Sequence, residues 1–178
     1  MVQRVLLLLD KAGIPYMVVG SFAASVYGIS RATHDLDIVI ALKPDAIQTL
    51  ANAFGEDFYF DEESAKSAVA HSDMFNIFHL ESGLKIDFWI LQDDEFNRTQ
   101  FDRRIPTKAW GTESYVASPE DTILSKLLWY KITPSDRQLA DVRAILTVQR
   151  DTLDYDYLRH WGTALDIEEL LNSLIEEK

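Results

Sequence analysis

The segment DLDIVI at residues 35–40 constrains the fold more than any other part of the sequence. Its β-branched and apolar residues are typical of a strand, whereas aspartate is depleted in strands. Side chains alternate between the two faces of a strand, so Asp35 and Asp37 point one way. The apolar residues Leu36, Ile38 and Ile40 point the other way. The segment therefore predicts a strand with one apolar face and one face that carries two like charges.

Two aspartates on one face of a strand repel each other unless a cation lies between them. A hard divalent ion is the natural occupant, because Mg²⁺ typically binds one or two protein carboxylates together with substrate phosphates. The alternative is a pair of exposed acids at the frayed start of a strand. Asp154 and Asp156 have the same spacing but no apolar strand beside them, and there we expect only exposed acids.

A second apolar segment, KIDFWI at residues 85–90, is also interrupted by an acid. Alternation places Lys85 and Asp87 on one face of this predicted strand. If the two strands are neighbours in a sheet, Asp87 joins Asp35 and Asp37 in a carboxylate triad. Two-metal phosphoryl chemistry needs that density of oxygen ligands, because the ions lie about 3.5–4 Å apart. The alternative is a local surface ion pair between Lys85 and Asp87.

Gly20 and Ser21 follow the β-rich residues 16–19 and precede a predicted helix at 22–27. Backbone N–H groups at a helix start bind phosphate readily, and glycine allows the backbone to approach the ligand closely. The pair therefore indicates a phosphate-binding turn. The alternative is that Ser21 is an ordinary helix cap.

The whole pattern predicts an α+β fold, in which a small mixed β-sheet is flanked by helices and followed by a C-terminal helical region. We expect helices at residues 2–12, 22–27, 44–54, 62–70, 119–131, 134–149, 154–161 and 166–177, strands at 16–19, 35–41, 58–60, 74–80 and 84–91, a helical turn near 93–101, and strand pieces around Ile105 and Tyr115. The predicted structure changes near residue 118 from mixed helices and strands to helices alone, and no low-complexity linker separates the two parts. We therefore expect an α/β core at 1–117 and a helical region at 118–178 packed on it as one compact unit.

In this order, Gly20-Ser21, Asp35-x-Asp37 and Asp87 resemble the signature of the polymerase-β-type nucleotidyltransferase superfamily. The residues around Asp87, Lys-Ile-Asp-Phe, resemble a motif of the abortive-infection-type nucleotidyltransferase toxins and their small bacterial relatives. The resemblance covers about residues 15–147. It implies the nucleotidyltransferase fold.

Later residues extend the same resemblance. Ser118-Pro119-Glu120 followed by Lys126 resembles the third motif of these proteins, and Asp141 resembles the fourth. Lys126 lies one helical turn from Trp129, so it borders an aromatic face, although its amine could still reach water. Asp141 lies at the edge of the apolar stripe of the next helix, where an ion pair with Arg137 is the alternative to a catalytic role.

The resemblance implies an enzyme that transfers a nucleoside monophosphate from a nucleoside triphosphate to an acceptor hydroxyl, with Mg²⁺ or Mn²⁺. The acceptor would be a transfer-RNA end, a protein or a small molecule, and the chain could belong to a toxin–antitoxin pair. The implied metal ligands are Asp35, Asp37 and Asp87, the catalytic set adds Lys126 and Asp141, and the nucleotide-binding residues are Gly20, Ser21, Lys85 and Lys126. The alternative is a non-catalytic relative that acts as an interaction or regulatory module with a protein partner.

The net charge of −12 argues against a general nucleic-acid coat, because phosphate neutralisation needs clustered cations. The nearest candidates for a local basic groove are Arg98, Arg103, Arg104 and Lys108, and the alternative is a solvated loop. Arg31 and His34 precede the first acid and could touch phosphate, although loop roles are the simpler interpretation.

The 178 residues include no cysteine, which excludes disulfides and thiolate metal sites and fits a reducing compartment. No apolar run approaches the roughly 20 residues that a membrane span needs. We therefore expect a cytoplasmic protein with no membrane contact. His71, His79 and His160 show no metal-ligand spacing.

Overall fold

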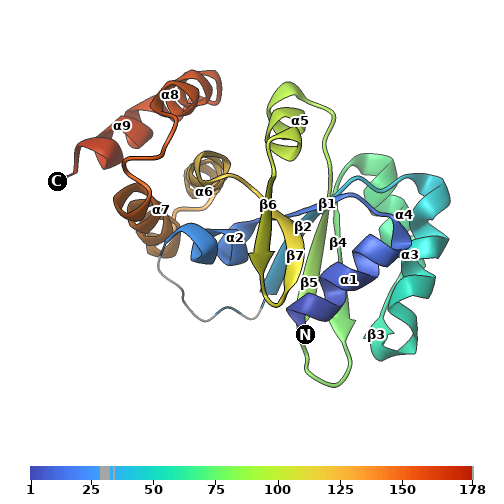
Figure 1. Cartoon of the computed structure of the whole chain (residues 1–178). Helices are drawn as coiled ribbons and strands as arrows, with labels where there is room; N and C mark the ends of the chain where they lie inside the picture. Colours follow the sequence, from blue (N-terminus) through green and yellow to red (C-terminus); the bar gives the residue numbers. More distant parts are fainter. Residues whose placement is uncertain (29–32, 34, 178) are drawn as a thin grey trace.

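A computed structural model describes residues 1–28, 33 and 35–177 (Figure 1). Its strands are β1 (Tyr16–Val18), β2 (Asp35–Ile40), β3 (Phe58–Tyr59), β4 (Met74–His79), β5 (Lys85–Ile90), β6 (Ile105–Ala109) and β7 (Thr112–Val116). They form one mixed seven-stranded sheet in the order β3-β4-β5-β2-β1-β7-β6. The predicted α+β class is confirmed.

Helices cover both faces of this sheet (Figure 1). They are α1 (Val2–Ala12), α2 (Gly20–Tyr27), α3 (Ile47–Phe54), α4 (Glu62–His71), α5 (Glu95–Asp102), α6 (Pro119–Ile132), α7 (Asp136–Val148), α8 (Tyr155–Ala164) and α9 (Glu168–Glu176), with short 3₁₀ turns η1 (Pro44–Ala46) and η2 (Gly55–Asp57). Each predicted helix and strand is present, with ends shifted by a few residues.

The centre of the sheet pairs the two strands that contain the acids. Strands β2 and β5 are parallel neighbours, and Asp37 lies opposite Asp87 in their register. On its other side β2 is antiparallel to β1, with Val18 opposite Ile38. Because β1 leads directly into α2, the start of that helix lies beside the middle of β2.

The two faces of the central strands have different neighbours. On the apolar face Phe88 is fully buried, and its ring centroid lies 5.8 Å from that of Phe54 in α3. On the opposite face Trp89 of β5 meets Trp129 of α6, with centroids 5.5 Å apart. The acids share this second face, because Asp87 and Trp89 are two residues apart in the strand. The carboxylates therefore lie between the sheet and α6.

The C-terminal helices begin at a capped turn. The Ser118 hydroxyl accepts a hydrogen bond from the Asp121 N–H at 3.0 Å, and Pro119 is the first residue of α6. Tyr157 of α8 donates to Oδ1 of fully buried Asp121 at 2.6 Å. A continuous hydrophobic core contains buried side chains from both the sheet and these helices, including Ile38 and Leu127.

Two local expectations need correction. The connection between β4 and β5 is five residues long rather than three, and its turn is closed by the Gly83 N–H donating to the His79 carbonyl at 2.9 Å and by a hydrogen bond between His79 Nδ1 and Ser82 Oγ at 2.8 Å. Helix α7 begins at Asp136 rather than at residue 134, because its N-cap Ser135 has an extended backbone, with φ −149° and ψ 124°.

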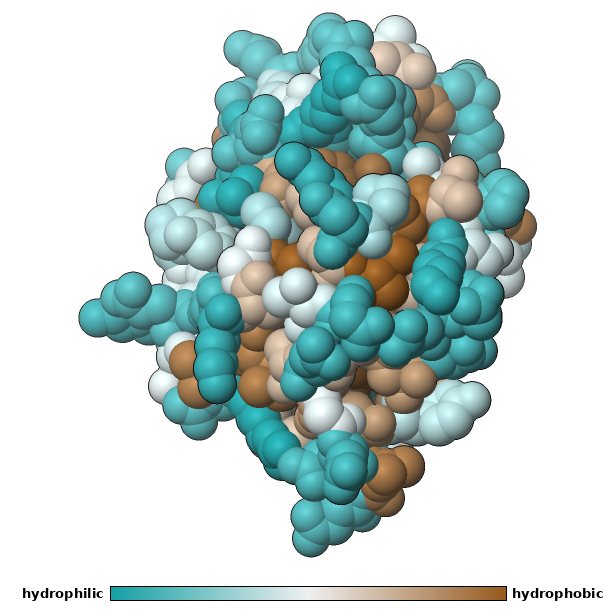
Figure 2. Space-filling model, turned by 90° about the vertical axis from the view of Figure 1, so that its right-hand side faces the viewer, coloured by the Kyte–Doolittle hydropathy of each residue, from teal (hydrophilic) through white to brown (hydrophobic). Residues whose placement is uncertain are grey.

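The side of the molecule that carries α3 and α4 is mostly hydrophilic, with a smaller hydrophobic area near its centre (Figure 2). Within the described ranges, no helix combines the length and the apolar character that a membrane-spanning segment requires.

Candidate active site

Asp37 and Asp87 form a carboxylate pair at the centre of the site. They lie opposite each other on adjacent parallel strands, and Asp87 is only 7% exposed. Oδ1 of Asp87 is buried and has no hydrogen-bond partner among the residues that the structure describes. A buried carboxylate oxygen without a partner is costly, so this atom is suited to receive a cation or a proton.

The electrostatics of Asp37 reflect this crowding. Burial, followed by the neighbouring charge of Asp87 and to a smaller degree that of Asp35, raises the pKa of Asp37, which is about 6 in the folded chain. A hydrogen bond from the Trp89 side chain and the positive charge of Lys126 act in the opposite direction on this pKa. The pocket therefore concentrates negative charge that a cation would relieve.

Asp35 and Lys85 lie opposite each other at the start of the same two strands. Asp35 is exposed, whereas the Lys85 amine is ion-paired with Asp87 Oδ2 at 2.8 Å. This hydrogen bond raises the pKa of Lys85 above its ordinary value. The predicted alternative of a Lys85–Asp87 pair is thus present, but its carboxylate is buried rather than on the surface.

The start of α2 approaches the carboxylate pair closely. Gly20 is the first residue of this helix and has a positive φ of 63°. The Val19 N–H donates to the Asp37 carbonyl at 3.0 Å. The N-cap is Val19, so the alternative of Ser21 as the capping residue is wrong. Ser21 lies in the first turn and lines the same pocket as Asp37.

Lys126 of α6 completes the charged groups of the site. Its amine is ion-paired with Asp141 Oδ2 at 2.8 Å and donates to Gln138 Oε1 at 3.1 Å. Lys126 is only 4% exposed, so the alternative of an amine that reaches bulk water is wrong. Asp141 thereby lies where it can support Lys126, as one of its predicted roles requires.

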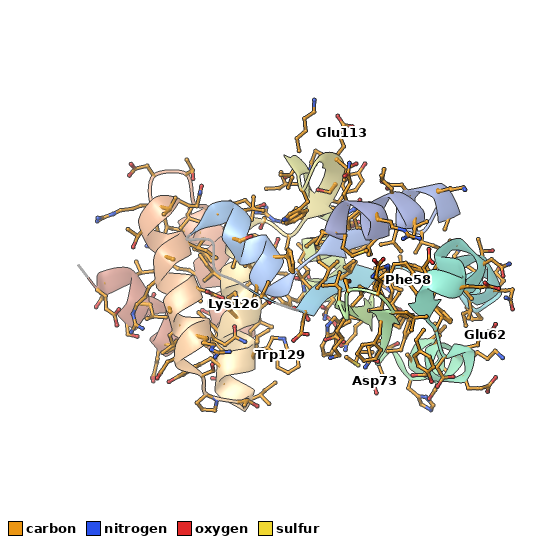
Figure 3. All side chains as sticks on the ribbon, turned by 90° about the horizontal axis from the view of Figure 1, so that it is seen from below. Phe58, Glu62, Asp73, Glu113, Lys126 and Trp129 are labelled. Atoms are coloured by element: carbon orange, nitrogen blue, oxygen red, sulfur yellow. The ribbon has the colours of Figure 1, made fainter. Side chains whose placement is uncertain are left out.

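Gly20, Ser21, Asp37 and Lys126 line one pocket of about 630 Å³ between the sheet, α5 and α6. Figure 3 shows Lys126 and Trp129 on α6 beside the sheet. Charged, aromatic and amide side chains line the cavity. The lining includes Gly20, Ser21, Asp37, Trp89, Gln92, Asn97, Gln100, Lys126, Trp129 and Gln138. A cavity of this size with a few convergent polar groups is typical of a small-molecule site.

A divalent ion fits the chemistry of this donor set. The two facing carboxylates, the partnerless oxygen of Asp87 and the raised pKa of Asp37 all favour a hard cation. The described residues contain no group of three acids or histidines already arranged to hold a metal. The structure thus brings together a pair, with Asp35 exposed at the strand start, and substrate phosphates would have to supply further ligands.

Several candidates lie away from this pocket. Ser118 caps α6. The Glu120 carboxylate accepts a hydrogen bond from the Asp154 N–H at 2.9 Å and so connects α6 to the start of α8. These residues of the third motif therefore have structural contacts. Asp154 itself caps α8, as its expected non-functional role allows. Arg31 and His34 lie outside the described residues.

The predicted basic cluster is locally neutralised. Arg98 is ion-paired with Asp93, and Lys108 with Glu113 at 3.8 Å. Arg103 lies 3.5 Å from the Glu120 carboxylate, and Arg104 lies over the ring of Phe101. Because Arg98, Arg103 and Lys108 each lie beside an acid, these three cations provide no uncompensated groove for phosphates.

Sequence reasoning missed two polar contacts of the site, those of Trp89 and Gln138. Trp89 is two residues beyond Asp87, so strand alternation alone places it on the acidic face. Gln138 lies three residues before Asp141 in α7, a spacing that places both on one helix face. Neither residue type is diagnostic of catalysis, which is why the pattern did not single them out.

The structure resembles solved structures of nucleotidyltransferases. The crystal structure of ANT(2'')-Ia in complex with adenylyl-2''-tobramycin aligns with a TM-score of 0.60 at 12% identity, over 93% of this chain and 94% of that chain. The solution structure of the antibiotic-resistance factor ANT(2'')-Ia gives a TM-score of 0.59 at 12% identity, over 97% and 92% of the two chains.

An antigenic nucleotidyltransferase-like protein from Paracoccidioides brasiliensis aligns with a TM-score of 0.52 at 17% identity, over 99% of this chain and 92% of that chain. Comparisons with protein-family models and with curated protein sequences find no match. The chain therefore has the nucleotidyltransferase fold. The finer resemblance to the abortive-infection-type toxins stays a prediction.

Proposed function

We propose that this chain is a metal-dependent nucleotidyltransferase, which transfers a nucleoside monophosphate from a nucleoside triphosphate to an acceptor hydroxyl. One observation carries the proposal: Asp37, which lies opposite Asp87 on the adjacent parallel strand, lines a pocket together with the start of α2 and Lys126. Two repelling carboxylates beside a helix start and a lysine are suited to bind a cation together with phosphates. The fold is consistent with this chemistry.

The reaction forms a bond between the acceptor oxygen and the α-phosphorus and breaks the bond from that phosphorus to the bridging oxygen, so pyrophosphate leaves. Asp37 and Asp87 would hold Mg²⁺ or Mn²⁺, with Asp35 at the rim. When bound, the ion supplies positive charge to the phosphates and stabilises the leaving group. As the alternative to binding the ion, Oδ1 of Asp87 would accept the proton of the acceptor hydroxyl and release it to water.

The chain's own groups position the nucleotide. The backbone at Gly20 and the side chain of Ser21 would contact phosphate at the start of α2. Lys126 would offset negative charge on the departing pyrophosphate, and Asp141 and Gln138 hold its amine in place. Lys85 is ion-paired with Asp87 and would offset its negative charge. When the ion binds, the Lys85 amine would contact phosphate instead.

The acceptor classes to test are a transfer-RNA end, a protein hydroxyl and a small molecule. The fold neighbour ANT(2'')-Ia was solved with adenylyl-2''-tobramycin, which makes small molecules the first class to examine. Arg98 and Lys108 of the basic cluster are each ion-paired with an acid, which further disfavours a large polyanionic acceptor.

The experiment is a transfer assay with the purified chain, each labelled ribonucleoside triphosphate and Mg²⁺. Transfer RNA, cell protein and a small-molecule extract are supplied separately, and both pyrophosphate release and the labelled product are measured. The combined variant Asp37→Asn, Asp87→Asn is the control and is expected to lose transfer. A wild type that labels no more than this variant with any acceptor would favour the non-catalytic interaction module.

A further inference from the structure

Two tryptophans form one wall of the pocket that contains Asp37. Trp89 extends from β5 and Trp129 from α6, and their rings meet at an angle of 64° with centroids 5.5 Å apart. Figure 3 shows Trp129 projecting from α6 toward the sheet. Although it packs against another aromatic ring, Trp129 is 46% exposed. Trp129 thus lines the pocket and keeps a large accessible surface.

The two rings are held in different ways. The Trp89 side chain hydrogen-bonds the Asp37 carboxylate, so its position is tied to that of the proposed metal ligand. Trp129 is in turn braced by the ring of Trp89. A rigid aromatic ring that packs against a neighbouring ring and still has a large exposed surface is suited to stack on a flat ligand.

Trp129 also lies next to the proposed phosphate contact. It follows Lys126 by three residues in α6, which corresponds to about 4.5 Å along the helix axis and places both on neighbouring positions of one face. A nucleotide whose phosphates lie between Asp37 and Lys126 can therefore extend its base toward Trp129. Gln92 and Gln138 line the same pocket, and amide groups can donate and accept hydrogen bonds at the edges of a base; Gln138 Oε1 already accepts from Lys126, which leaves its NH₂ group for a ligand.

We propose that Trp129, braced by Trp89, is the surface on which the base of the nucleoside triphosphate stacks. The inference rests on the proposed function and adds the residue that binds the base. Stacking on an aromatic ring is tolerant of base identity, because every base has a flat π-face. The Trp129 ring therefore supplies affinity for any nucleobase, and hydrogen bonds from the surrounding amides would select among the bases.

The test measures two affinities by calorimetry in the presence of Mg²⁺, one for ATP and one for inorganic tripolyphosphate. Trp129→Leu is expected to weaken ATP binding by about 5- to 150-fold, the range for removal of one base–aromatic stack. Its affinity for tripolyphosphate should stay within about twofold of the wild type, because no base is present. Trp129→Phe keeps a flat ring and should retain much of the ATP affinity.

Tyr130→Leu is the matched control, because Tyr130 is the next aromatic residue of α6 and is not among the lining residues of the described pocket. It should leave both affinities unchanged. Equal losses of ATP and tripolyphosphate binding in Trp129→Leu, or ATP binding equal to that of the wild type, would each overturn the inference while leaving nucleotidyl transfer possible. A wild type that binds neither ligand would overturn the proposed function together with the inference.

Discussion

The backbone of Gly20 lies directly against the carboxylate of Asp37. A methyl group at position 20 would lie 2.9 Å from Asp37 Cγ and closer still to Oδ2. The Val19 N–H also donates a hydrogen bond to the Asp37 carbonyl at 3.0 Å, so the residue before α2 is bonded to the strand that presents the carboxylate. The missing side chain at position 20 therefore determines how closely this helix start approaches the proposed metal ligand.

Gly20→Ala should destabilise the fold and weaken Mg²⁺ binding, because the added methyl group has to displace the Asp37 carboxylate. Gly13→Ala is the matched control, since Gly13 also has a positive φ, of 67°, but no atom of the described residues lies within 4 Å of the added methyl. It should lose only about 1–2 kcal/mol of unfolding free energy from backbone strain and keep its Mg²⁺ affinity. Urea unfolding and Mg²⁺ titration measure both effects, and equal losses for the two variants would contradict the close packing.

Mg²⁺ should raise the melting temperature of the wild type. At a concentration about ten times Kd, an ion that binds only the folded chain adds about 1.4 kcal/mol. For a chain of this length that corresponds to about 3–6 °C. Asp37→Asn should raise the melting temperature in chelator, since it removes repulsion with Asp87, and should reduce the shift with Mg²⁺.

Thermal melts at constant ionic strength measure this shift without confusing screening with binding. Asp156→Asn is the control, because Asp156 belongs to a second Asp-x-Asp segment and its side chain is 99% exposed. It should show the same Mg²⁺ shift as the wild type. A wild type whose melting temperature is indifferent to Mg²⁺ and Mn²⁺, with and without nucleoside triphosphate, would argue against the metal site.

The metal-free protein should lose stability as pH rises between about 4 and 6. Burial raises the pKa of Asp37 to about 6, so the folded chain keeps a proton there that the unfolded chain has already released. The free energy of unfolding therefore falls across this window by at most about 1.4 kcal/mol per pH unit for this group. Urea unfolding in chelator should show this fall in the free energy of unfolding for the wild type, and Asp37→Asn should lack the part that Asp37 contributes. Parallel pH profiles of the two proteins would exclude it.

Lys126 should have separable effects on stability and on phosphate binding. Lys126→Met leaves the charge of Asp141, which is 8% exposed, without this partner, and breaking such a buried pair typically costs about 3–5 kcal/mol. Adding Asp141→Asn removes that charge and should return part of the stability. Binding of a nucleoside triphosphate should remain weak in both variants, whereas binding of the free nucleoside changes little. A double variant that regains triphosphate affinity would assign Lys126 to packing alone.

Local patterns in the sequence predicted most of the elements, because hydrophobic periodicity and turn residues act over a few neighbouring positions. Alternation in the segment 35–40 correctly separated a fully buried face from the face with the acids. The same reasoning was less exact at the ends of the elements. The connection after β4 is one case, since it contains a hydrogen bond between the His79 and Ser82 side chains that the residue types alone did not indicate.

The residue types on each face of the two acidic strands follow from the order of residues in the chain, because side chains alternate along a strand. That β2 and β5 are parallel neighbours, in the register that sets Asp37 opposite Asp87, follows only from the folded arrangement. The same holds for the contact of Lys126 with Asp141 and for the position of Trp129 in the pocket wall. Strand order and helix packing are set by contacts between residues far apart in the chain, and no local pattern encodes them.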